Sequence, residues 1–208
     1  MKIISPLYEI LYMPSPAEIL QCIEQAGRTC YKSEGKITDD SASVFVERLI
    51  RSGHLSPLEH MSITVKFICD RGVSHELVRH RLAAYSQEST RYCNYSKGKF
   101  DNEITVIKPP FWNERTIEYR DWKYAMMDAE RFYLNLIRYG ARPEEARSVL
   151  PNSLKTEIVM TANLREWRHV FKQRCDKAAH PQMREIMCPL RDELIGLLPE
   201  VFVGLKEP

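Results

Sequence analysis

The sequence lacks the long apolar segments and the charge excess of a membrane protein or a general nucleic-acid binder. No stretch approaches the roughly 18 consecutive apolar residues that a membrane span requires. The N-terminal MKIISPLYEILYM contains a proline and a glutamate and does not fit a signal peptide, so we expect a cytoplasmic protein. The formal net charge is only +2, so any basic site must be local, and we expect neither nucleic acid nor a membrane as partner.

Paired cysteines are also absent. The six cysteines form no C-x-x-C pair, and 44% of the 208 residues are hydrophobic, which is enough for an ordinary core. The cysteines are therefore predicted to be reduced thiols. His75 and His80 are five residues apart and miss the four-residue helical spacing of a zinc pair, so no metal site is predicted.

Repeats, low-complexity segments and linkers are absent as well, which predicts a single α+β domain over residues 1–208. Alternating or β-branched segments predict strands at 2–12, 61–69, 103–110 and 153–163. Apolar periodicity and capping residues predict helices at 16–27, 39–52, from 73 onward, and at 113–139, 143–150, 165–175 and 181–199. Ser15 and Pro16 are the predicted start of the first helix, Thr38 is the predicted cap of the second, and Gly140 is the predicted end of the helix at 113–139.

What is present is a concentration of cations and hydroxyls in residues 79–92, RHRLAAYSQESTRY, with a single acid, Glu88. Arginine binds phosphate or carboxylate through a two-pronged fork. If the segment starts as a helix, Arg79 and Arg81 point to different sides. An extended segment after a turn would instead place Ser89 and Arg91 on one face as a phosphate clamp.

The alternative is a solvated surface, on which these arginines pair with Glu76 and Glu88, and residue patterns alone favour neither interpretation. Three other places could bind ligands, and for each an ordinary structural interpretation is at least as good. HLSPLEH at 54–60 could be a capped loop, with Ser56 bonded to backbone and Glu59 paired with a histidine. Arg147 could pair with Glu144 on a short helix.

The last of the three follows the strand at 153–163. There Asn163, Leu164 and Arg165 precede a helix that carries His169 and Arg174. Asp176 could neutralise Arg174. No one of these places is specific by itself, and their order along the chain is the stronger signal.

Taken together, these motifs resemble the flavin-dependent thymidylate synthases. The family signature is Arg-His-Arg, seven residues, then serine, and it stands here as Arg79-His80-Arg81, LAAYSQE and Ser89. HLSPLEH, ARSVLP, TANLRE and Gln173-Arg174 resemble further family segments in the same order, over nearly all of the chain. The resemblance implies a curved, mainly antiparallel sheet flanked by helices, assembled as a homotetramer with shared active sites.

The resemblance also implies the chemistry. dUMP would be methylated to dTMP with methylenetetrahydrofolate as carbon donor and FAD, reduced by NADPH, as hydride donor. All of these ligands are anionic and could balance the unpaired arginines of residues 79–92. Arg174 would activate the uracil ring, because a guanidinium stabilises an ionised ring, and neither Cys175 nor Cys188 would act as a nucleophile.

The resemblance assigns roles to individual residues. The FAD contacts are His54, Ser56, Arg79, His80, Arg81, Gln87, Asn163, Leu164, Arg165 and His169. The nucleotide contacts are Glu76, Leu77, Val78, Arg79, Gln87, Glu88, Ser89, Thr90, Arg91, Arg147 and Arg174. This chain departs from the family pattern at Glu76, Ala84, Ser86 and Gln87, and glutamine cannot act as a base. No role is carried to His180, Gln182 or Arg184.

Two other functions fit parts of the sequence. A nucleotide-binding module without catalysis would keep the phosphate clamps but turn nothing over. A binder of single-stranded nucleic acid could stack bases on Tyr85, Tyr92 and Tyr95 between the arginines. The near-neutral net charge argues against the second function, and the retained Arg174 and Ser89 argue against the first.

Overall fold

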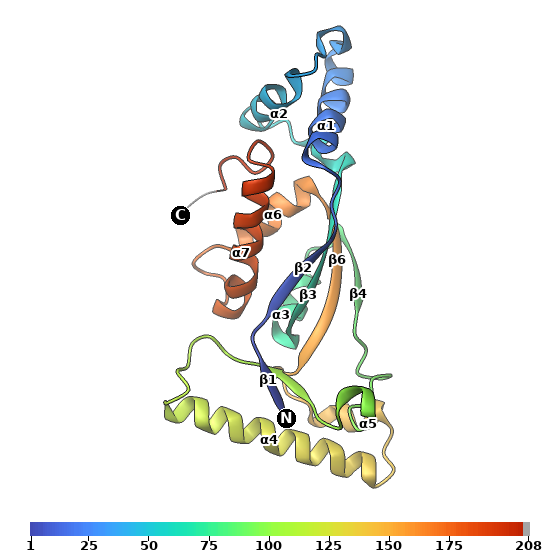
Figure 1. Cartoon of the computed structure of the whole chain (residues 1–208), viewed down its shortest axis with the longest axis vertical. Helices are drawn as coiled ribbons and strands as arrows, with labels where there is room; N and C mark the ends of the chain where they lie inside the picture. The colour runs from blue at the N-terminus through green and yellow to red at the C-terminus, as the bar shows by residue number, and fades with distance from the viewer. Residues whose placement is uncertain (206–208) are drawn as a thin grey trace. The chain divides into compact units, whose positions relative to one another are not determined.

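A computed structural model describes residues 1–205 (Figure 1). It is an α+β protein whose chain forms two compact units, each assembled from three separate segments. Unit 1 comprises Met1–Leu7, Phe67–Arg79 and Ser86–Val159, and unit 2 comprises Tyr8–Lys66, His80–Tyr85 and Met160–Pro208. Within residues 1–205, no helix combines the length and the apolar character that crossing a membrane demands.

Most elements follow the predicted order, with ends that differ by a few residues, but β4 was not predicted and the predicted strand at 2–12 is two strands. The strands are β1 Lys2–Ile4, β2 Leu7–Tyr12, β3 Ser62–Asp70, β4 Ala83–Gln87, β5 Thr105–Ile107 and β6 Lys155–Asn163. The α-helices are α1 Pro16–Tyr31, α2 Ser41–Arg51, α3 Arg71–Leu77, α4 Ile117–Arg138, α5 Pro143–Ala146, α6 Leu164–Arg174 and α7 Pro181–Leu197. Short 3-10 helices are η1 Glu34–Lys36, η2 Ser56–His60, η3 Gly98–Phe100 and η4 Arg147–Val149.

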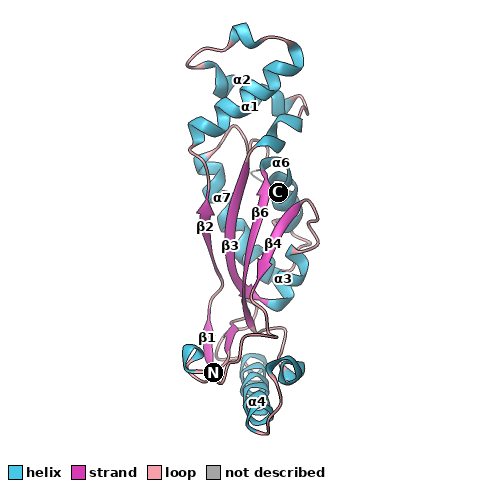
Figure 2. Cartoon of the chain, turned by 90° about the vertical axis from the view of Figure 1, so that its right-hand side faces the viewer, coloured by secondary structure: helices cyan, strands magenta, loops and turns pink. Residues whose placement is uncertain are grey.

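Two sheets organise the strands (Figure 2). One has the order β2-β3-β6-β4, and the other pairs β1 with β5 in parallel. β3 and β6 run antiparallel, because Leu164 N donates to Met61 O at one end while Arg71 N donates to Asn152 O at the other. Both strands bury every second residue over most of their length, the period-2 pattern of a sheet with one covered face.

In unit 2, α6 is fixed against β3 through its aromatic residues. Trp167 is fully buried and its indole Nε1 donates to Ile63 O over 3.1 Å. Trp167 stacks on Phe171, which in turn contacts Phe202 edge-on. Buried aromatic groups of this kind contribute a large share of core stability. The position of α6 matters because this helix carries Leu164, Arg165, His169 and Arg174 of the predicted site.

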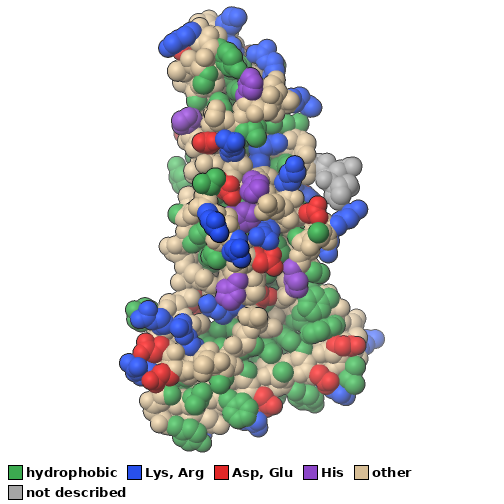
Figure 3. Space-filling view, turned by 180° about the vertical axis from the view of Figure 1, so that it is seen from behind, with side chains coloured by type: hydrophobic (Ala, Val, Ile, Leu, Met, Phe, Trp, Pro, Cys, Tyr) green, Lys and Arg blue, Asp and Glu red, His purple; other side chains and the backbone are tan. Residues whose placement is uncertain are grey.

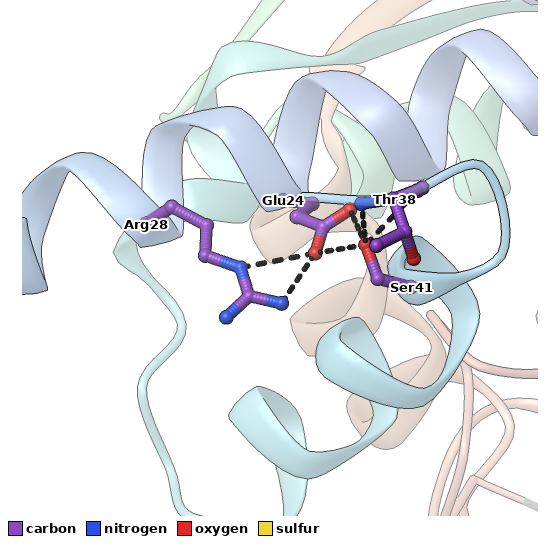
Figure 4. A network of polar contacts seen from close by, with 4 residues as sticks. All are labelled: Glu24, Arg28, Thr38 and Ser41. Carbon is purple, nitrogen blue, oxygen red and sulfur yellow. Dashed lines mark hydrogen bonds and ion pairs between the residues drawn. The ribbon is translucent and has the colours of Figure 1, made fainter. Parts of the chain in front are cut away.

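Helices α1 and α2 of unit 2 are joined by a buried polar network (Figure 4). Arg28 donates to Glu24 from Nε and Nη2, and the hydroxyl of Ser41 on α2 donates to the same carboxylate. The Ser41 hydroxyl also accepts the backbone N–H of Thr38. Gly27 permits the close approach, since a Cβ there would lie 2.7 Å from side-chain atoms of α2. Thr38 was predicted to cap this helix, but the cap position is Asp40.

Unit 1 has a separate core beneath α4. It contains Tyr95, Ile104, Val106, Tyr119, Trp122, Met126, Tyr133, Ala146 and Leu154. Tyr133 is fully buried and its hydroxyl accepts the backbone N–H of Tyr95. The predicted helix end at Gly140 is confirmed, because this glycine has φ of 95° and follows directly on the last turn of α4.

Candidate active site

The Arg-His-Arg segment lies in a turn, which corrects the prediction that a helix from residue 73 includes it. Helix α3 ends at Leu77, with Val78 as its cap, and Arg79 N donates to Glu76 O in a tightened last turn. Arg79 and Arg81 are exposed, whereas His80 is buried. The alternative of a surface pair with Glu88 is not formed, because the Glu88 carboxylate pairs with Lys155 over 2.9 Å.

In unit 2, the buried His80 connects to α6 through both ring nitrogens. Arg174 Nε donates to His80 Nε2 over 2.9 Å. On the other side of the ring, Nδ1 lies 3.3 Å from Oε1 of Glu166. His169 contacts the same ring edge-on, with 5.8 Å between ring centroids. A buried carboxyl, two imidazoles and a guanidinium therefore meet in one cluster.

Electrostatics keep the His80 ring neutral. Burial, Arg174 and His169 together lower its pKa from 6.5 to about 4. Since Nε2 accepts from Arg174, the neutral ring carries its proton on Nδ1, the nitrogen that faces Glu166. Burial also raises the pKa of Glu166, although His169 opposes that shift. Neutral His80 and charged Arg174 are thus compatible at neutral pH.

The same cluster has the donor types of a metal site. Ligand atoms of His80, Glu166 and His169 lie within 4.8 Å of one another. However, His80 Nε2 already accepts from Arg174, and the permanent charge of that guanidinium opposes a second cation. The cluster is better suited to an anion beside Arg174 than to a metal ion.

Most predicted cofactor contacts of unit 2 line two adjoining cavities. One, of about 660 Å³, includes Asn163, Arg165 and His169. The other, of about 370 Å³, includes His54 and Ser56. Both are lined by Leu55 and Arg165, so they are neighbours, and their volumes lie in the range of small-molecule sites.

Several side chains in these cavities have partners that differ from the sequence alternatives. Glu59 pairs with Arg165 at 2.5 Å and not with a histidine. His54 Nδ1 shares a hydrogen bond of 2.7 Å with the hydroxyl of Tyr31. Asn163 caps α6 by accepting the N–H of Glu166. No side-chain capping bond is formed at the start of η2, where Ser56 stands.

Sequence reasoning missed Glu166, Arg168 and Lys172, which also line the larger cavity. Arg168 and Lys172 follow Arg165 by three and seven residues, the interval of one helical face, which could have revealed them, whereas Glu166 is adjacent to Arg165 and has no such signal. A third cavity, of about 720 Å³, lies between α1 and α2, and His54 is the only predicted site residue in its lining. Its lining contains Arg28, Lys36 and Arg48 against one acid, Asp40, and Arg28 is paired with Glu24.

In unit 1, the predicted nucleotide contacts lie on a turn and on short helices. Ser89 and Arg91 were predicted to share one face of an extended segment, and this is wrong. The segment is a turn, in which the Ser89 carbonyl accepts the N–H groups of Tyr92 and Cys93. The Ser89 hydroxyl accepts Arg91 N over 3.3 Å, which leaves its own proton available for a ligand. β4 ends at Gln87, and the turn therefore begins two residues later.

Arg91 and Arg147, the two cationic residues of this region, make only long polar contacts within the protein. Arg91 Nε lies 3.9 Å from Glu144, and Arg147 Nη1 donates to Thr90 Oγ1 over 3.3 Å. Glu144 thus pairs with Arg91 and with Arg142, and the predicted Arg147–Glu144 salt bridge is not formed. Both guanidinium groups are exposed and can adjust to a bound anion.

Gln87 and Glu88 point into unit 1. Gln87 Nε2 donates to the hydroxyls of Ser74 and Thr156, over 2.9 and 3.2 Å. The Glu88 carboxylate is paired with Lys155 at 2.9 Å and accepts from Tyr95. The Glu88 backbone N–H is bonded to Glu157 O, so its side chain and its N–H are both engaged within the protein.

The tyrosines do not form a stacking platform. Tyr95 is 4% exposed and lies in the core, and the hydroxyl of half-buried Tyr85 donates to His80 O. Among Tyr85, Tyr92 and Tyr95, only Tyr92 is exposed. Figure 3 shows Lys, Arg and His side chains distributed over one face, with Asp and Glu among them. This arrangement does not favour single-stranded nucleic acid.

Comparison with known proteins decides the family. Residues 11–200 match the family model described as thymidylate synthase complementing protein. The chain belongs to this family. A flavin-dependent thymidylate synthase of Geobacter sulfurreducens is 33% identical over 184 residues, which cover 85% of this chain and 78% of the relative. The match to that of Pyrococcus abyssi, 34% over 160 residues, covers 76% of this chain and 65% of the relative.

A solved structure shares the fold. The UMP/dUMP methylase PolB from Streptomyces cacaoi, bound with 5-Br dUMP, has a TM-score of 0.77 and 22% identity. The match covers 97% of this chain and 95% of PolB. The predicted resemblance to the flavin-dependent thymidylate synthases is confirmed, and the α+β fold with an antiparallel sheet is confirmed with it.

Proposed function

We propose that the protein is a flavin-dependent thymidylate synthase, which converts dUMP to dTMP. Methylenetetrahydrofolate supplies the carbon, and FAD, reduced by NADPH, supplies the hydride. The observation that carries the proposal is Arg174, a permanently charged group fixed by a neutral histidine within a member of this family. The solved methylase of the same fold, which holds a brominated dUMP, supports a pyrimidine nucleotide as substrate.

Arg174 activates the uracil ring. Carbon 5 of uracil is a weak nucleophile until negative charge develops at N3 and its flanking oxygens. A guanidinium remains protonated at any working pH and stabilises this charge, and such fixed electrostatic stabilisation is a large contribution to catalysis. Because His80 holds Nε, the plane of the guanidinium is set before the nucleotide binds.

A cysteine nucleophile is not required by this route. Cys175 is buried, and its burial and the neighbouring Cys188 raise its pKa to about 12. A thiol with so high a pKa supplies very little thiolate at neutral pH. Cys188 lies within α7, half-buried, as expected for a packing residue.

The residues of unit 2 fit an anionic cofactor of the size of FAD. The two adjoining cavities provide a helix N-terminus at Asn163, the Arg165 guanidinium and the histidines. Glu59 neutralises Arg165 and would have to yield to a cofactor phosphate. We assign the cofactor contacts to His54, Ser56, Arg79, His80, Arg81, Gln87, Asn163, Leu164, Arg165 and His169.

We assign the dUMP contacts to Glu76, Leu77, Val78, Arg79, Gln87, Glu88, Ser89, Thr90, Arg91, Arg147 and Arg174. The Ser89 hydroxyl and the exposed guanidinium groups suit a phosphate, which accepts several charge-assisted hydrogen bonds. For Glu88, only the carbonyl remains for the nucleotide, because its other polar groups are already bonded.

The assembly follows the same resemblance. We assign residues 1–208 to one synthase domain built on a curved sheet, which acts in the cytoplasm as a homotetramer with active sites shared between subunits. Sedimentation velocity would test the tetramer, and a monomer at micromolar concentration with full activity would contradict it.

The deciding experiment is a visible absorption spectrum of the purified protein under anaerobic conditions. We expect a flavin band that NADPH bleaches, faster when dUMP is present, followed by dTMP formation when methylenetetrahydrofolate is added. A protein that neither contains nor takes up FAD would refute the synthase. If it still bound dUMP in a calorimetric titration, it would be a nucleotide-binding module.

A further inference from the structure

Glu166 has no assigned role in the resemblance, yet it lies at the centre of the His80 cluster. It is 6% exposed and is positioned by α6, whose first turn contains it and whose last residue is Arg174. Residues 166 and 174 are eight positions apart, which is twice the four-residue spacing of neighbours on a helix surface, so they lie along one side of α6. His80, from the turn before β4, contacts both of them.

The two contacts of His80 require one tautomer. The 2.9 Å hydrogen bond needs a lone pair on Nε2, because the Arg174 Nε–H can only donate. A neutral imidazole with a lone pair on Nε2 carries its proton on Nδ1. Oε1 of Glu166, 3.3 Å away, places negative charge beside that proton.

Without such a partner, an imidazole favours the opposite tautomer, with the proton on Nε2. In that state Nε2–H would face Arg174 Nε–H, and two donors would repel each other. His80 would then turn away, and Arg174 would lose its hydrogen bond to the His80 ring. The position of Arg174 therefore depends on the group that faces Nδ1.

We propose that Glu166 is a positioning residue, which selects the Nδ1-protonated tautomer of His80 and thereby fixes the guanidinium of Arg174. The proposal rests on the proposed function in one respect: it makes the orientation of Arg174 important for uracil activation. The tautomer itself is a property of the free protein and can be measured without any substrate.

The first measurement is the nitrogen NMR spectrum of the full-length protein labelled with ¹⁵N-histidine. A protonated ring nitrogen and one with a lone pair differ strongly in chemical shift, and the His80→Gln variant identifies the His80 signals by their loss. In the wild type we expect the proton on Nδ1. In Glu166→Leu we expect a shift towards the Nε2 tautomer, and in Glu166→Gln retention of the wild-type pattern, because an amide oxygen still accepts from Nδ1–H.

The second measurement is turnover. For Glu166→Leu we expect kcat to fall about 10- to 100-fold, the range for misplacement of a catalytic group, with KM for dUMP and FAD content nearly unchanged. Glu166→Gln should recover kcat to within about threefold of the wild type, since the tautomer is kept. The control is Glu47→Leu, a half-buried residue of α2 paired with Arg51, which should leave kcat unchanged.

The outcomes separate the two proposals. A wild-type His80 with its proton on Nε2, or Glu166→Leu with wild-type shifts and kcat, would overturn the role of Glu166. A wild type that shows the Nδ1 tautomer but forms no dTMP would overturn the proposed function and leave the tautomer selection standing. If Glu166→Leu does not fold, the wild-type and Glu166→Gln spectra still decide the tautomer.

Discussion

His80 in unit 2 and Arg147 in unit 1 both belong to the motifs of the family, but the protein holds them differently. His80 is 4% exposed and contacts Arg174, Glu166 and His169. Arg147 is exposed and makes a single side-chain hydrogen bond, at 3.3 Å, to Thr90. A group that must be oriented for chemistry gains from such fixation, whereas one that binds phosphate can adjust when the ligand arrives.

The largest effect is expected for Arg174→Lys. Lysine keeps the charge but has neither the planar fork nor the Nε–H that His80 accepts. We expect kcat to fall by about 10²- to 10³-fold, as when one transition-state donor is lost, while FAD binding persists. Steady-state rates of dTMP formation measure this, with Arg51→Lys on the surface of α2 as the control. A loss below about threefold would mean that orientation in unit 2 does not matter.

The pH dependence of stability tests how firmly the His80 cluster is fixed. The pKa of His80 is about 4 in the folded protein, against 6.5 for an exposed histidine. Between these pH values the unfolded chain binds a proton that the folded chain does not, so stability falls as pH falls. The contribution of His80 is complete above pH 6.5 and decreases by roughly 3 kcal/mol on acidification through pH 4.

Urea unfolding at a series of pH values measures this effect, with His80→Gln as the reference. Arg174, His169 and Glu166 face His80, and the raised pKa of Glu166 acts in the opposite direction because its folded carboxyl binds a proton more readily. The difference between wild type and His80→Gln removes that common background. If the difference stayed constant from pH 7 to 4.5, the cluster would not be held in its neutral form.

The sequence predicted the elements of both units better than their local geometry. The start of α1 was predicted correctly from Ser15 and Pro16, and the Ser15 hydroxyl forms a capping box with Glu18, whereas the cap predicted for α2 at Thr38 was wrong. The end of α3 was missed, because no glycine or proline follows Leu77 and the chain turns there through backbone bonds alone. Pattern rules detect caps and breakers, and a tightened last turn carries neither.

Ion pairs and hydrogen bonds between residues far apart in the sequence were the least predictable feature. Glu144 lies three residues before Arg147 and was considered as its ion-pair partner. In the structure Glu144 pairs with Arg91 and Arg142 instead. The role of Glu166 was invisible because its partner, His80, lies 86 positions away on the chain, beyond any local spacing rule. The family signature names the ligand-binding residues, whereas the groups that support them come from the fold.

Gln87→Glu is expected to have a smaller effect and probes the polar network of unit 1. The Gln87 amide donates to Ser74 and Thr156, and Ser74 already donates its own proton to Arg71 O. An introduced carboxylate can accept from Thr156 but faces the Ser74 oxygen without a proton between them. We expect a loss of about 1–2 kcal/mol at pH 8, the cost of one unsatisfied polar contact.

The stability loss caused by Gln87→Glu should depend on pH. A protonated carboxyl can donate to Ser74 as the amide does, so the pKa of the introduced group is raised and the deficit shrinks as pH falls. Thermal unfolding at pH 8 and pH 5 compares the two forms, with Gln173→Glu on the exposed end of α6 as the control. An equal deficit at both pH values would show that the network had rearranged around the charge.

The smallest effect is expected for Arg147→Lys. Because Arg147 is exposed and held by one hydrogen bond, it contributes little to folding, and its role in the proposal is to contact the dUMP phosphate. Lysine retains the charge but cannot bind phosphate through two parallel hydrogen bonds, so we expect KM for dUMP to rise about three- to tenfold with kcat unchanged. Arg142→Lys is the matched control, since Arg142 is also exposed in unit 1 but is already paired with Glu144 and Glu145. A fall in kcat as large as that of Arg174→Lys would mean that Arg147 is also an orienting group, and the contrast between an adjustable unit 1 and a fixed unit 2 would be wrong.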